Sequence, residues 1–179
     1  YYILSERKQN KKIDKRAPVI VGVGDLVDRS KEDGLNPQEL LAKACEHAIQ
    51  DSGIKELSNH IDYVGVVRFT VDFLTATNQS NFQYSNFPRT LANKLNISAK
   101  NEVYAPMGGN SPQVLLEDAL VKISTGETDC ALLSGGEALQ TMIAKLKAGM
   151  SLDWLDEPGG SPEMIGNNDI GFSDHEKLH

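Results

Sequence analysis

A glycine-rich turn is the stretch of this sequence best suited to chemistry. Residues 104–116 read Tyr-Ala-Pro-Met-Gly-Gly-Asn-Ser-Pro-Gln-Val-Leu-Leu, with a short extended run before the turn and a helical apolar pattern after it. We expect Gly108 and Gly109 to adopt backbone angles that other residues avoid, which would let a strand turn sharply into a helix. In α/β enzymes a turn of this kind often holds a nucleophile or binds an anion.

The apex of the turn offers backbone groups rather than a nucleophile. Ser111 is expected to be the helix N-cap, with its hydroxyl occupied by a backbone N–H, and Pro112 the first helical residue. The amides of Gly109, Asn110 and Ser111 would then lie at the positive end of the helix, where they could polarise a carbonyl group or hold an anion. A turn that only packs a helix against a strand is an equal alternative.

The cysteines and histidines do not complete a catalytic set. Cys45 falls on the apolar stripe of a predicted helix and Cys130 lies within a predicted apolar strand, so we expect both thiols in the core. The four histidines lie in polar surroundings and are expected at the surface: His47, His60, His175 and His179. No metal-ligand spacing is present, and no bound cofactor is expected.

The elements that would position the turn alternate along the chain. Apolar runs predict strands at 17–24, 61–69, 101–105 and 129–134, and helical spacing predicts helices at 36–52, 89–95, 111–125 and 141–148. The run at 17–24 is rich in Val and Ile, which predicts a strand buried on both faces. A polar stretch at 70–86 is expected to be a long loop. This alternation predicts a layered α/β domain with a mainly parallel central sheet flanked by helices.

Composition limits the classes of partner. The chain has 179 residues, 40% hydrophobic and 24% charged, with a net charge of −7, which argues against nucleic acid and anionic membranes. We expect no membrane span, because no apolar run approaches the roughly 20 residues required. Two separated cysteines and a charged N-terminus favour a reducing, cytoplasmic location. We divide the chain into a basic arm at 1–16, an α/β domain at 17–140, and the start of a loop or cap region at 141–179 that looks incomplete.

The motifs, in this order and spacing, resemble the N-terminal half of the thiolases, closest to the sterol-carrier-type and acetyl-CoA acetyltransferase-like branch. Three stretches carry the resemblance: Pro-Val-Ile-Val-Gly-Val-Gly-Asp at 18–25 with its helix ending in Asp-Ser-Gly, the turn and its helix ending in Ile-Ser-Thr-Gly-Glu-Thr-Asp, and the strand ending in Ser-Gly-Gly-Glu-Ala at 134–138. The resemblance implies a thiolase-like layered fold, of which this chain supplies the N-terminal half.

The same resemblance implies chemistry on acyl-CoA in lipid metabolism. Thiolases carry Cys-x-Ser-Gly-x-Gln at this turn, and their cysteine accepts the acyl group. Alignment on Gln113 places Gly108 at the cysteine position, Asn110 at the serine and Ser111 at the glycine. Glycine cannot form a thioester, so the standard covalent step is not available at this position. The family's catalytic His and second Cys, which come from its C-terminal half, have no counterpart here.

Three functions stay open. The first is an acyl-CoA-handling transferase of the acetyl-CoA acetyltransferase type, with Gly108, Gly109, Asn110 and Ser111 as substrate-binding residues and CoA or acyl-CoA as substrate. The second is a non-catalytic CoA- or lipid-binding protein, or a structural thiolase-like subunit. The third is a nucleotide-binding domain that uses Gly22 and Gly24, although Val27 occupies the position of the third fingerprint glycine. The resemblance also implies a homodimer or dimer of dimers, for which residues 101–105 would offer a pairing edge.

Overall fold

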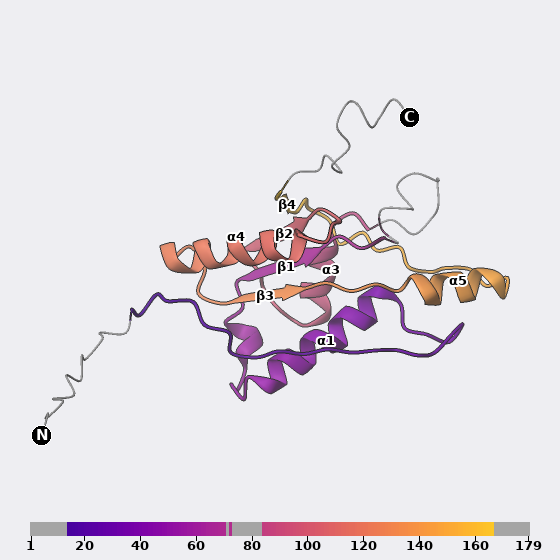
Figure 1. Cartoon of the computed structure of the whole chain (residues 1–179), viewed down its shortest axis with the longest axis horizontal. Helices are drawn as coiled ribbons and strands as arrows, with labels where there is room; N and C mark the ends of the chain where they lie inside the picture. The colour runs from indigo at the N-terminus through magenta and orange to yellow at the C-terminus, as the bar shows by residue number, and fades with distance from the viewer. Residues whose placement is uncertain (1–13, 71, 73–83, 167–179) are drawn as a thin grey trace, which may run out of the picture.

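The chain folds into one layered α/β unit. A computed structural model describes residues 14–70, 72 and 84–166 (Figure 1). The elements are α1 (Pro37–Asp51), a 3-10 turn η1 (Leu57–Asn59), β1 (Tyr63–Val67), α3 (Phe87–Lys94), β2 (Asn101–Ala105), α4 (Ser111–Thr125), β3 (Ala131–Ser134), α5 (Leu139–Lys147) and β4 (Glu163–Met164). Most of the predicted loop at 70–86 and most of the basic arm fall outside the described residues.

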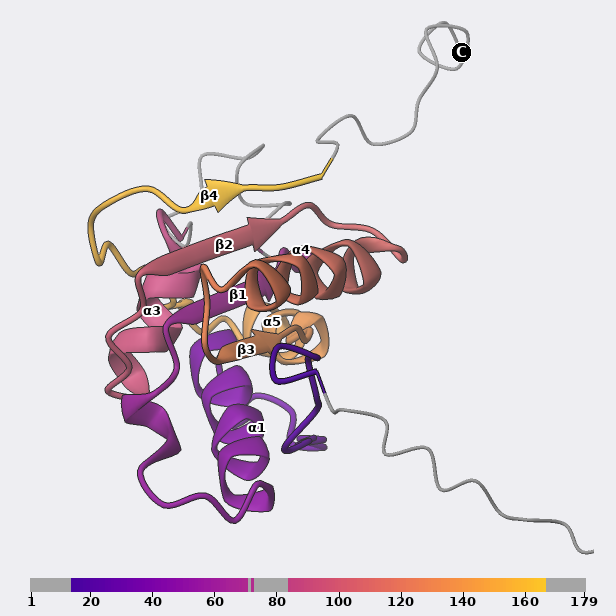
Figure 2. The same ribbon diagram turned by 90° about the vertical axis from the view of Figure 1, so that its left-hand side faces the viewer.

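The four strands form one parallel sheet in the order β3-β1-β2-β4 (Figure 2). Strand β1 is central, with Val67 opposite Ala105 of β2 and Val66 opposite Ser134 of β3. The prediction of a mainly parallel α/β sheet is therefore confirmed. Because the strands are parallel, their carboxyl ends lie at one edge, where the turn at 106–111 leaves β2.

Two apolar layers hold the sheet. Val64 and Val66 point to the side covered by α1 and α3, whereas Tyr63 and Gly65 point to the side covered by α4. Gly65 is required there, because a Cβ atom at this position would lie 2.7 Å from Cδ1 of Leu115. This alternation follows the two-residue period of a strand.

The helix boundaries follow the local sequence signals. Asn36 caps α1 through a capping box with Glu39, and the helix ends before Gly53, whose φ is +64°. Gly126 ends α4 in the left-handed region at φ +81°. The predicted helices at 36–52, 89–95, 111–125 and 141–148 are all present, with shifts of one to two residues at several ends.

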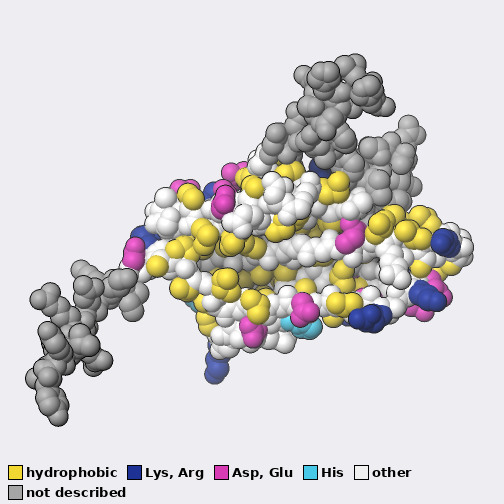
Figure 3. Space-filling view, viewed as in Figure 1, with side chains coloured by type: hydrophobic (Ala, Val, Ile, Leu, Met, Phe, Trp, Pro, Cys, Tyr) yellow, Lys and Arg dark blue, Asp and Glu magenta, His cyan; other side chains and the backbone are white. Residues whose placement is uncertain are grey.

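The predicted buried strand at 17–24 is wrong. These residues form no strand, and the side chains of Val19 and Ile20 are 75% and 78% exposed. Hydrophobic side chains are scattered over the face of the molecule shown in Figure 3. The segment lies against α1 instead: the amide of Val23 donates to Oδ2 of Asp51 at 2.9 Å. The hydrogen bond to Asp51 and the close packing of Gly22 and Gly24 on α1 hold this segment against the helix rather than in the sheet.

The two glycines of this segment have a packing role. A Cβ atom at Gly22 would meet the carbonyl oxygen of Ala48, and one at Gly24 would meet that of Ala44. The close approach of the chain to the α1 backbone therefore requires glycine at both positions. This contact accounts for the Gly22–Gly24 pair without a nucleotide, and the first glycines of the fingerprint do not open a helix here.

Replacement of Gly24 tests this packing. We expect Gly24→Ala to lower the free energy of unfolding by about 1–3 kcal/mol, since the added methyl group overlaps the α1 backbone. Gly109→Ala is the matched control, because a Cβ atom there meets nothing within 4 Å and should leave stability nearly unchanged. Urea denaturation measures both variants, and equal midpoints would contradict the contact.

Candidate functional site

The turn at the carboxyl end of β2 lies among the ends of its neighbours. The amide of Arg68, the first residue after β1, donates to the carbonyl of Ala105 at 3.0 Å. The turn residues Gly108, Gly109 and Asn110 are exposed to solvent, whereas Ser111 is buried. The four predicted site residues therefore lie at the edge of the sheet where the carboxyl ends of the parallel strands meet, which is the edge where ligands of such sheets commonly bind.

The geometry of the turn differs from two expectations. Neither Gly108 nor Gly109 is among the described residues with positive φ, so the turn does not need the left-handed region. Asn110, not Ser111, is the N-cap, with φ −93° and ψ −9°, and α4 begins at Ser111. The cap is made by the backbone, because the side chain of Asn110 forms no capping bond. Glycine at 108 is thus not a conformational requirement of the turn.

The amides of the turn are not equivalent. The Ser111 amide donates to the carbonyl of Gly108 at 3.1 Å, so it is not available to a ligand. Within the described part of the chain, the amides of Gly109 and Asn110 have no hydrogen-bond acceptor. Two of the three predicted amide donors therefore remain free at the exposed apex, beside the positive end of α4.

Two oxygen atoms border the space that a side chain at position 108 would enter. A Cβ atom built on Gly108 would lie 3.2 Å from Oδ1 of Asn110 and 3.2 Å from Oγ of Ser111. These contacts are tight but involve side-chain atoms that can rotate. A larger residue at 108 would therefore fit with small adjustments, and its side chain would start between a carboxamide and a hydroxyl group.

A buried polar network beside the turn was missed by the sequence reasoning. Asp72 accepts a hydrogen bond from the Tyr104 hydroxyl at 2.8 Å. Its carboxylate also forms an ion pair with Arg68, whose Nε lies 2.9 Å away. The Arg68 guanidinium also lies 4.9 Å from the centroid of the Tyr104 ring. Burial, together with the Asp72 charge, raises the pKa of Tyr104 well above its usual value. No sequence motif marks this network, because Arg68 and Asp72 meet Tyr104 of β2, which lies 32 residues after Asp72 in the sequence.

The cysteines and the described histidines remain structural. Burial raises the pKa of the Cys45 thiol and of the Cys130 thiol, which favours the unreactive protonated form. Nδ1 of His47 lies 2.9 Å from the carbonyl oxygen of Asp25. No group of three or more His, Cys, Asp or Glu residues that could hold a metal ion occurs among the described residues.

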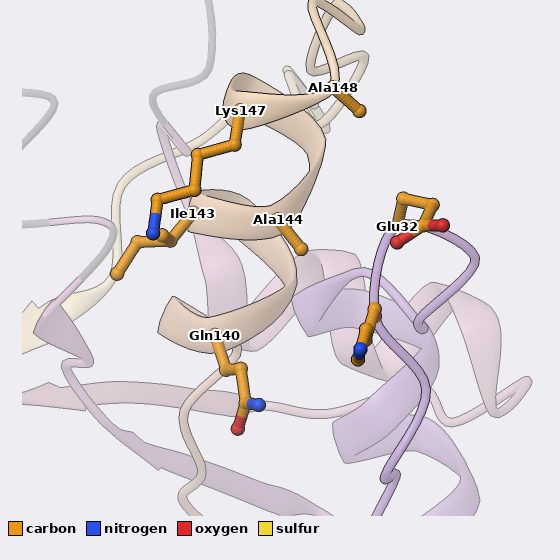
Figure 4. Close-up of a pocket in the computed structure, with 7 residues that line it drawn as sticks. Glu32, Gln140, Ile143, Ala144, Lys147 and Ala148 are labelled. Carbon is orange, nitrogen blue, oxygen red and sulfur yellow. The ribbon is translucent and has the colours of Figure 1, made fainter.

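A separate hollow lies away from the turn. It measures about 480 Å³ and lies between α5 and the loop that carries Lys31 and Glu32 (Figure 4). Gln140, Ile143 and Ala144 line it from α5, and none of the turn residues does. Because it is open to solvent and its wall mixes both charges with an apolar side chain, we assign the candidate site to the turn instead.

Comparison with known proteins identifies the fold class. No family model matches the sequence, and no curated protein matches it. Among solved structures, the chain is similar to a monomeric SCP2-thiolase-like protein type 1 from Mycobacterium smegmatis, with 32% sequence identity and a TM-score of 0.54. The match covers 70% of this chain and 24% of that protein.

The likeness confirms the resemblance seen in the sequence. The protein is a layered α/β protein with a parallel sheet, and its matched part belongs to the thiolase-like superfamily. The chain spans about a quarter of the length of the protein that it matches. In the described residues, no helix is both long enough and apolar enough to cross a bilayer.

A thiol placed at the turn tests its position at the helix terminus. We expect Gly108→Cys to react with iodoacetamide at pH 7 at least about tenfold faster than Cys45 or Cys130, because a helix N-terminus favours a thiolate and burial disfavours it. Labelling of the two native thiols should rise only at higher pH, since their pKa values are raised. Peptide mass spectrometry measures each site, and equal labelling of all three thiols would place the reactive apex elsewhere.

Proposed function

We propose that this chain binds acyl-CoA without forming a covalent intermediate, and that the turn at 108–111 holds the thioester. The observation that carries the proposal is the pair of free amides at Gly109 and Asn110. Two amide donors at a helix N-terminus suit a carbonyl oxygen that is polarised or becomes negatively charged. The similarity to an SCP2-thiolase-like protein supports acyl-CoA as the ligand class.

The absence of a side chain at Gly108 determines which kind of acyl-CoA protein is favoured. Gly108 offers no atom to accept an acyl group, and Ser111 is buried in the first turn of α4. The Arg68–Asp72–Tyr104 network holds its ionisable groups in mutual contacts, and the raised pKa of Tyr104 disfavours its use as a base. We therefore favour acyl-CoA binding over acetyl-CoA acetyltransferase activity, which remains the second candidate because of the fold.

The proposal also covers the oligomeric state of the protein and its cellular location. A homodimer through the free edge of β2, as the resemblance implies, is not available in this conformation, because β4 pairs with Val103 and Tyr104. A homodimer or dimer of dimers would require release of β4 or another surface. Two free thiols, Cys45 and Cys130, favour a reducing compartment such as the cytoplasm.

Removal of one turn amide tests ligand binding directly. Gly109→Pro deletes the N–H of residue 109, and we expect it to weaken acetyl-CoA binding about five- to twentyfold, the effect of one lost hydrogen bond to a polarised oxygen. Free CoA has no thioester carbonyl, so its affinity should not change. Gly109→Ala keeps the amide and fills open space, so it serves as the matched control. Isothermal titration calorimetry measures all three proteins.

The pattern of affinities separates the candidates. Equal weakening of CoA and acetyl-CoA in Gly109→Pro would mean that the proline disturbed the whole turn rather than one donor. Failure of the unaltered protein to bind either ligand would contradict the proposal. Thiolysis of acetoacetyl-CoA by the unaltered protein would favour the acetyltransferase candidate.

A further inference from the structure

An arginine at the carboxyl edge of the sheet is held from inside the protein and reaches solvent. Arg68 directly follows β1, and its Nε lies 2.9 Å from Oδ2 of Asp72. The Asp72 side chain is only 1% exposed, whereas the Arg68 side chain is 31% exposed. The carboxylate therefore lies on the interior side of this ion pair, and a ligand at the edge would meet the guanidinium group rather than the acid.

The contacts of Asp72 fix the position of this guanidinium group. Oδ2 of Asp72 also accepts the Tyr104 hydroxyl at 2.8 Å, and Oδ1 accepts the amide of Tyr84 at 3.3 Å. Cζ of Arg68 lies 4.9 Å from the centroid of the Tyr104 ring. A charged group that is already held in place loses less conformational entropy when a ligand binds to it.

The ion pair leaves part of the Arg68 guanidinium open. It uses Nε, and within the described residues no carboxylate or carbonyl oxygen accepts a hydrogen bond from the two terminal nitrogens. Arg89 shows the contrast, because its Nε pairs with Glu102 at 2.7 Å and its Nη1 also donates to the carbonyl of Gly159 at 3.1 Å. Arg68 thus keeps a planar fork of N–H donors, the geometry that binds a carboxylate through two parallel hydrogen bonds.

The other carboxylate close to Arg68 in the sheet is engaged with backbone groups. Glu137 follows β3, and its Oε2 accepts the amide of Thr70 at 2.7 Å while its Oε1 accepts the amide of Ala138 at 3.0 Å. Glu137 is therefore not the partner of the open Arg68 donors, which remain available to a ligand.

Arg68 also lies close to the turn. Strands β1 and β2 run side by side to this edge (Figure 2), and the amide of Arg68 donates to the carbonyl of Ala105 at 3.0 Å. Gly108 follows Pro106, the next residue of the chain, by two positions, which span at most about 7 Å. In an acyl-CoA, the long pantetheine arm separates the thioester from the phosphates, whereas the far end of a short acyl group is only a few bonds away. The position of Arg68 therefore suits the end of the acyl group.

We propose that Arg68 is a specificity-determining residue that binds a terminal carboxylate on the acyl group, so that the ligands of this site are CoA thioesters of short dicarboxylic acids. The inference rests on the proposed function, since it takes the thioester to lie at the amides of Gly109 and Asn110. The carboxylate accepts both terminal nitrogens of Arg68, and Asp72 holds the guanidinium group from behind. An acyl group that ends in a methyl group would leave these donors without an acceptor.

Two ligands with acyl groups of equal carbon number isolate the effect of the carboxylate. Succinyl-CoA and butyryl-CoA both carry a four-carbon acyl group, which ends in a carboxylate in the first and in a methyl group in the second. We expect the unaltered protein to bind succinyl-CoA at least about tenfold more tightly, as a bidentate ion pair would give. Isothermal titration calorimetry measures both ligands, with free CoA as the reference.

Substitutions assign this preference to Arg68. Arg68→Lys keeps the charge but loses the fork, so we expect the preference to fall about fivefold. Arg68→Gln with Asp72→Asn removes both charges, leaves no unpaired buried carboxylate, and should bind the two ligands about equally. The matched control is Arg89→Lys, which replaces a partly exposed arginine paired through Nε with the second residue of β2, Glu102, and should keep the preference.

Three results would overturn the inference. One is equal affinity of the unaltered protein for succinyl-CoA and butyryl-CoA, a comparison that needs no variant to fold and that leaves acyl-CoA binding itself supported. Another is a preference for succinyl-CoA that survives in the double variant, because a different group would then bind the carboxylate. The third is an equal loss of affinity for succinyl-CoA and free CoA in Arg68→Lys, which would assign Arg68 to the phosphates. A protein that binds none of these ligands would instead contradict the proposed function.

Discussion

The pairing of β1 with strands on both sides is the constraint on which the rest of this structure depends. Its register sets Val67 beside Ala105, so the chain leaves β1 and β2 at the same edge of the sheet. Its alternating side chains then separate the α1 and α3 layer from the α4 layer. The turn at 108–111 is positioned by this arrangement, since α4 must pack over Gly65 immediately after the turn.

Much of this fold could be predicted from sequence because its signals are local. The capping box at Asn36 and the glycine that ends α4 depend on residues within one helical turn, and both elements are where the pattern indicated. The prediction of a strand at 17–24 failed for a different reason. The composition of this segment shows that it is apolar, but the surface on which it packs depends on contacts with residues of α1 that lie 20 or more positions further along the chain. Strand β4 was missed because two residues carry no periodicity.

The candidate site, like the fold, could be predicted only in part. The sequence located the turn and its four residues, whereas the conformation of the turn was wrong in detail. Gly108 and Gly109 do not adopt left-handed backbone angles, and the Ser111 amide already donates a hydrogen bond within the turn. Since glycine is not required for the backbone at 108, the lack of a nucleophile there is a property of the side chain alone. The proposal of acyl-CoA binding rests on the free amides of Gly109 and Asn110, and the covalent step is the part that the residues do not support.

The central claim is that the turn binds an acyl thioester without accepting its acyl group. Mass spectrometry of the protein mixed with acetyl-CoA tests this claim most directly, with one sample sprayed under native conditions and one after denaturation. We expect a protein–acetyl-CoA complex in the native spectrum and the unmodified mass of the chain in the denatured one. An acetyl adduct that survives denaturation, or a native spectrum without any complex, would contradict the account.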